Sequence, residues 1–129
     1  MLTRLIACSL LLLASTSAIA QTQLQLNRDA CAEYQKADQK LNATYQQILQ
    51  QHKGDAVFIR KMKKAQRAWL AFRDAELAAI YPADNKQLEY GSMYPMCNCT
   101  EQTALVNQRI QQLSAWLNAK EGETCRGSR

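Results

Sequence analysis

The sequence predicts an all-α protein: an antiparallel up-down-up bundle of three long helices, bridged by a disulfide. Residues that favour helices, chiefly Ala, Gln, Leu, Lys and Arg, are abundant, whereas Val, Ile and Thr are scarce. Four glycines and two prolines divide the chain into three long blocks and a tail. Each block repeats apolar residues at steps of three and four, the period of a helix with one buried face. A chain of 129 residues, 47% of them hydrophobic, has room for one modest domain.

Residues 1–20 predict a secretory signal peptide that is cleaved near Ala20. Arg4 is followed by a short apolar core at 10–14 and a small-x-small site at 18–20. The apolar run is too short to cross a bilayer, so no transmembrane segment is expected. Cys8 resembles a lipidation site, but only seven residues precede it. We therefore expect a periplasmic or secreted protein whose mature chain has a net charge of about +4.

The mature chain divides into an N-terminal arm at 21–27, a three-helix domain at 28–118 and a flexible C-terminal tail at 119–129. Residues 21–27 alternate in polarity but have no second strand to pair with. The first helical block, 28–52, carries one stripe formed by Tyr34, Asp38, Leu41, Tyr45 and Ile48.

The second block opens at Asp55, a good N-cap residue after the Lys53-Gly54 turn. Its predicted buried stripe consists of Phe58, Met62, Ala65, Trp69, Phe72 and Ile80. The third block starts at Ser92, with Pro95 tolerated in the first turn, or at Asn98. Its stripe consists of Val106, Ile110, Leu113 and Leu117.

Asp38 is a carboxylate inside an apolar stripe and needs a partner. If the first two blocks fold back about residues 53–54, Asp38 lies opposite Trp69 and within one turn of Arg73. The sequence therefore predicts a structural ion pair between Asp38 and Arg73.

The four cysteines of the mature chain favour disulfides over metal ligands in an exported protein. With turns near 53–54 and 87, Cys31, Cys97 and Cys99 lie at one end of the bundle. Cys99 lies two steps of seven residues before Leu113 and therefore on the same face of the helix. Cys31–Cys99 is thus the predicted bridge, and Cys97 is the alternative partner for Cys31. Cys125 is too far along the tail to reach back easily, and a free or intermolecular thiol is expected there.

Three segments resemble a known family: Ala37–Asn42 followed by Tyr45, the block Ala65–Ala75, and Gly91-Ser92 with a late Gln108-Arg109. Over residues 31–117 the chain is similar to the LprI-type lysozyme inhibitors, which are small, helical, cysteine-bearing exported proteins of bacteria. The resemblance implies that this protein binds and blocks a lysozyme.

Catalysis, metal binding and nucleic-acid binding find little support in the residues. His52 is the one histidine, no nucleophile setting or phosphate loop occurs, and the carboxylates are dispersed. The Cys97-x-Cys99 spacing does not fit common zinc sites. Export removes nucleic acid as a target for the basic cluster of block two. We therefore expect a non-enzymatic protein with no cofactor and a protein partner; the oligomeric state stays open.

Two segments are candidates for partner binding. One is the face of block two that carries Arg60, Lys63, Lys64 and Arg67. The other is the 82–92 connection, with Lys86 and Tyr90. A cation from either segment could pair with the two carboxylates of a lysozyme cleft. Two other classes stay open: an envelope module that binds an acidic partner or cell-wall polymer, and a toxin-immunity protein.

Overall fold

The fold is known from a computed structural model that describes residues 2–129, with side chains from Thr22 onward. Three long helices dominate it: α1 (Leu2–Gln51), α2 (Ala56–Ile80) and α4 (Tyr94–Leu117). A short helix α3 (Lys86–Tyr90) and two 3-10 turns, η1 (Gly91–Met93) and η2 (Thr124–Arg126), complete the secondary structure. No strand occurs in residues 2–129, so the all-α class is confirmed.

Helix α1 is longer than the sequence analysis predicted, because the expected arm at 21–27 is part of it. The alternating segment there contains Gln, Leu and Thr but no glycine or proline, so nothing interrupts the helix. The alternating polarity was therefore misleading, and the prediction of a separate arm at 21–27 was wrong. The predicted cleavage after Ala20 and the side chain of Cys8 lie outside the side chains that the structure describes.

The ends of α2 and α4 follow local sequence signals. The Asp55 carboxylate accepts a hydrogen bond from the Phe58 N–H at 2.9 Å, which confirms it as the N-cap of α2. Helix α2 ends before Pro82, as the restricted backbone before a proline favours. Helix α4 begins at Tyr94 with Pro95 in its first turn, close to the earlier of the two predicted starts.

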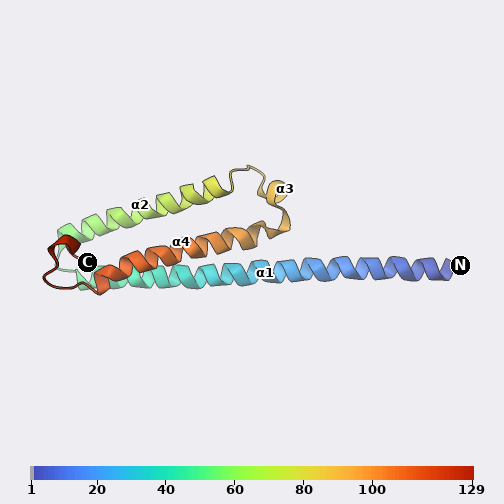
Figure 1. The fold of residues 1–129 in the computed structure, drawn as a ribbon, viewed down its shortest axis with the longest axis horizontal. Coiled ribbons are helices and arrows are strands. Elements are labelled where there is room, and N and C mark those ends of the chain that lie inside the picture. The colour runs from blue at the N-terminus through green and yellow to red at the C-terminus, as the bar shows by residue number, and fades with distance from the viewer. Residues whose placement is uncertain (1) are drawn as a thin grey trace.

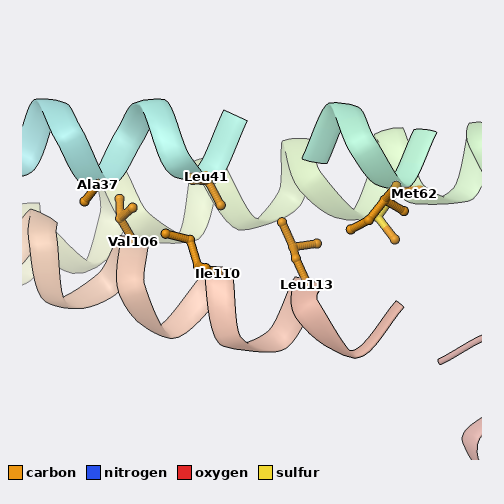
Figure 2. Packing of buried hydrophobic residues seen from close by; sticks show 7 residues of the cluster. Ala37, Leu41, Met62, Val106, Ile110 and Leu113 are labelled. Carbon is orange, nitrogen blue, oxygen red and sulfur yellow. The ribbon is translucent and has the colours of Figure 1, made fainter. Parts of the chain in front are cut away.

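Helices α1 and α4 form the closely packed pair that holds most of the core. In Figure 1 the chain follows α1 to the turn at 52–55, reverses in α2 and returns in α4, so α1 and α4 run in the same direction. Figure 2 shows Ala37 and Leu41 of α1 pointing toward Val106 and Ile110 of α4. The most completely buried side chains also come from these two helices: Leu41, Ile48, Val106 and Leu113.

The disulfide fastens this pair at the end nearest α3. Cys31 and Cys99 are bridged, with a Cα–Cα distance of 5.0 Å, so the predicted pairing is confirmed. One turn before the bridge, the Asn27 amide donates to the Ser92 carbonyl at 3.0 Å. Neither Cys97 nor Cys125 is bridged within the chain, as expected for Cys125.

Helix α2 packs less closely than an even three-helix bundle requires. It moves away from α1 between the 52–55 turn and α3, and its main neighbour is α4 (Figure 1). Its only buried residues are Met62 and Gln66, whereas the predicted core residues Phe72 and Ile80 are 51% and 40% exposed. The sequence stripe was therefore only partly correct. The face of α2 that meets α4 includes Gln66, so part of the predicted apolar stripe lies outside this contact.

The C-terminal segment 119–129 was predicted to be a flexible tail, but the structure places its end against α4. The Trp116 indole N–H donates to the Ser128 hydroxyl at 3.0 Å. The Arg129 guanidinium lies 5.7 Å from the centre of the Trp116 ring, within cation–π range. Trp116 is therefore covered partly by the chain's own terminus, a contact that sequence periodicity cannot predict.

Candidate functional site

The predicted basic face of α2 is present as a continuous exposed surface. Its four side chains, at helical spacings of three and four, are all exposed: Arg60, Lys63, Lys64 and Arg67. None of them forms an ion pair within the described part of the chain. The four charges are therefore available to an anionic partner.

The connection between α2 and α4 is an internally bonded loop. We define residues 81–94 as the α3 loop. The Lys86 ammonium donates to the carbonyl oxygens of Tyr81 and Ala83, at 2.6 Å each. The Tyr90 hydroxyl accepts a hydrogen bond from the Ala83 N–H at 3.2 Å. Lys86 and Tyr90, both predicted to contact a partner, therefore hold the loop in shape, and Lys86 is not presented outward as a free cation.

Three tyrosine rings stabilise the same loop. Tyr81 packs edge-on against Tyr90 and Tyr94, with ring centroids 5.3 and 5.2 Å apart, and Tyr90 stacks on Tyr94 at 5.8 Å. Burial is the main cause that raises the pKa of the Tyr81 hydroxyl above its ordinary value. This cluster fixes the path of the chain on either side of α3.

The predicted ion pair between Asp38 and Arg73 was wrong. The Arg73 guanidinium pairs with the neighbouring Asp74 carboxylate at 2.8 Å. Asp38 is half-buried and accepts a hydrogen bond from the Asn42 amide, one turn along α1, at 3.2 Å. Each of these charged groups therefore has its partner on its own helix.

Among the residues whose side chains the structure describes, the buried charged group is Arg109, in α4. Its side chain is almost fully enclosed, and its Nε donates to the Gln66 amide oxygen of α2 at 3.0 Å. Nη1 donates to Gln112 at 3.1 Å, whereas Nη2 is buried without a hydrogen-bond partner. Burial lowers the pKa of this guanidinium. The arrangement joins α2 to α4 through polar atoms where an apolar seam was expected.

Trp69 lies between two arginines of this region. The guanidinium carbons of Arg73 and Arg109 are 5.7 and 5.9 Å from the centre of its ring. Gln66, Trp69, Arg73 and Arg109 all lie in segments that carry the family resemblance, but the sequence did not predict that they lie close together. Positions 106, 109 and 113 fall on one seam at steps of three and four, and this signal could have placed Arg109 on the buried side.

Across the residues that the structure describes, no three His, Cys, Asp or Glu side chains come together in a way that could hold a metal ion. Within the same residues, no helix combines the length and apolar character that crossing a membrane requires.

The arrangement can be compared with known proteins. The family model described as "Lysozyme inhibitor LprI" matches residues 14–113, which include α2, the α3 loop and the Gln66–Arg109 contact. The chain belongs to the LprI lysozyme-inhibitor family. A relative of this LprI chain, an uncharacterized protein of Rhizobium meliloti (strain 1021), is 32% identical over 115 residues, covering 79% of this chain and 78% of the relative. No solved structure matches the chain significantly.

Several residues of the segments that resemble the LprI family have a structural role in this chain. Gln66, Trp69 and Arg109 join α2 to α4 within the LprI match, and two of the three are buried. The segments that carry the family resemblance of this chain therefore include residues that shape its helical frame. The basic face of α2 and the α3 loop contribute exposed side chains instead.

Proposed function

We propose that this LprI protein is an exported, non-catalytic inhibitor of lysozyme or of a related peptidoglycan hydrolase, acting by covering the substrate cleft. The match of the lysozyme-inhibitor family over residues 14–113 is the observation that carries the proposal. The signal peptide predicted at 1–20, with predicted cleavage near Ala20, and the Cys31–Cys99 bridge fit a protein that folds in an oxidising compartment.

Occlusion is the mechanism that suits this chain. A preformed binding surface loses little conformational entropy when it binds, and the α1–α4 pair is already held by a disulfide and a continuous core. A folded domain seated over the cleft excludes a polysaccharide without carrying out any chemistry. Inhibition should therefore be competitive with cell-wall substrate.

The test is a panel of lysozymes assayed with the purified mature protein. Lytic rate on cell walls and direct binding are measured for each lysozyme at low and high salt. The same protein with its disulfide reduced and its helices unfolded serves as the inactive control. Inhibition at stoichiometric concentrations of inhibitor supports the proposal. A protein that neither binds nor slows any lysozyme of the panel contradicts it.

A second function is favoured by one observation, the unpaired basic face of α2. Four exposed cations that form no ion pair within the described part of the chain fit an anionic cell-wall polymer or an acidic protein. Such binding would weaken steeply with salt and would leave lytic rates unchanged. Replacing Arg60 and Lys64 by glutamine should abolish it, whereas the same change should have little effect on occlusion of a basic lysozyme.

A further inference from the structure

The most exposed large apolar side chain of residues 22–129 is Leu88, at the outer turn of the α3 loop. It is 82% exposed, well above the next, Val57, at 58%. A single exposed leucine is ordinary on a protein surface. Leu88 is unusual because of the structure that holds it.

The backbone on both sides of Leu88 is fixed by specific contacts. The Asn85 side chain accepts a hydrogen bond from the Leu88 N–H itself at 3.0 Å and so caps α3. Gly91, at φ 67°, ends α3 in a conformation that favours glycine. Together with the bonds of Lys86 and Tyr90 and the tyrosine cluster, these contacts order the loop before any partner arrives.

The charges around the loop differ from those at the other end of the molecule. Residues 68–108 contain five acidic and two basic side chains. Both basic groups are engaged, Arg73 with Asp74 and Lys86 with backbone carbonyls. Among the acidic ones, Asp84 and Glu89 are exposed on the loop itself. The basic surface lies instead in residues 53–67, at the opposite end of α2.

This polarity decides which partner fits each end. Animal-type lysozymes are strongly basic, and the net positive charge of this chain would oppose their approach. The α3 end offers the opposite local charge, so a basic protein approaching that end is attracted, while the basic end of α2 repels it.

We propose that the α3 loop is the docking element of this protein and that Leu88 inserts into an apolar recess on a basic protein. The proposal rests on the proposed function, which makes that basic protein a lysozyme. Leu88 supplies the buried centre of the interface, and Asp84 and Glu89 supply an acidic rim. Affinity then comes from a rigid apolar contact, and the rate of association comes from the rim.

The test measures binding and inhibition of a basic animal-type lysozyme by the full mature chain and its variants. Leu88→Ala should weaken binding by about tenfold or more, as for a central interface residue. The matched control is Val57→Ala, an exposed apolar residue at the basic end, which should bind like the unmodified chain. Both variants should keep the thermal stability of the parent because neither side chain is buried.

The acidic rim has its own variant. The double change Asp84→Asn with Glu89→Gln should slow association severalfold at low salt and have little effect at high salt. Inhibition by Leu88→Ala within about twofold of the parent overturns the docking proposal and leaves lysozyme inhibition intact. A parent chain that binds no lysozyme overturns the proposed function and this assignment with it. Dimerisation that Leu88→Ala abolishes, with lysozyme binding unchanged, also overturns it, since Leu88 would then face a second copy.

Discussion

The contact between Gln66 and Arg109 offers the sharpest test of how α2 is held. Gln66 and Met62 are the buried residues of α2, and Gln66 accepts from the buried Arg109 guanidinium at 3.0 Å. We consider Gln66→Leu, Arg109→Met and the two together. Each single change removes one side of the hydrogen bond, and the double change replaces both with apolar side chains of similar length.

The magnitudes follow from which group is left without a partner. Gln66→Leu leaves a charged Nε buried without an acceptor, beside an Nη2 that already has none, and should lower the free energy of unfolding by about 2–3 kcal/mol. Arg109→Met leaves the neutral Gln66 oxygen unpaired and should cost about 1–2 kcal/mol. Arg109 has no carboxylate partner, so the double variant should lie within about 1 kcal/mol of the parent. The implied coupling is on the order of 2 kcal/mol or more.

Urea unfolding followed by circular dichroism gives the four free energies of the cycle. Hydrogen exchange in α2 provides a second readout, because Gln66→Leu should release α2 while the α1–α4 pair stays protected. The control is Gln112→Ala, which removes the exposed partner of Arg109 and should cost less than about 1 kcal/mol. Single effects that simply add, with a coupling below about 0.5 kcal/mol, would refute this reasoning.

Three further predictions concern the bridge, the N-terminus and the tyrosines. Replacing Cys31 and Cys99 by serine releases a link across 68 residues and should lower the free energy of unfolding in urea by about 4 kcal/mol; a loss below about 1 kcal/mol would contradict the entropic account. Mass spectrometry of the exported product should find Gln21 at its N-terminus, whereas a lipid-modified chain in the membrane fraction would exclude cleavage there. Burial, as the main cause, raises the pKa of Tyr34 and Tyr81 above the ordinary 10.0, so the unfolded chain loses these protons first as pH rises. Stability should therefore hold below pH 10.0 and fall above it, and an ultraviolet titration in which both tyrosines ionise as free tyrosine does would contradict this.

The two exposed surfaces also separate the candidate functions. Variants of the basic face of α2 test binding to an anionic polymer, and variants of the α3 loop test docking to a basic protein. Because the surfaces lie toward opposite ends of α2, changes in one should leave the other unaffected. The pattern of losses across the two sets therefore reports which function the chain performs.

Much of the fold could be predicted from local features of the sequence. Helix periodicity, the Asp55 cap and the breaks at Pro82 and Gly91 act over a few residues, so they located the long helices of the domain. The Cys31–Cys99 bridge could also be predicted from the sequence. The number of residues along a helix fixes both the height of a side chain along the helix axis and its angle around that axis. The family motifs are likewise short stretches of sequence, and the family match agrees with them.

The tertiary structure alone decided how these helices use their polar side chains. Periodicity assigns a face to each helix but does not say how two helices pack together. In the folded chain Phe72 is exposed, and Arg73 pairs with its neighbour Asp74. Lys86 appeared to be a free cation until the fold brought two carbonyl oxygens within 2.6 Å of it. Long polar side chains have many rotamers and bond to whichever group lies within about 3 Å, so their partners depend on backbone positions that only the packed chain defines.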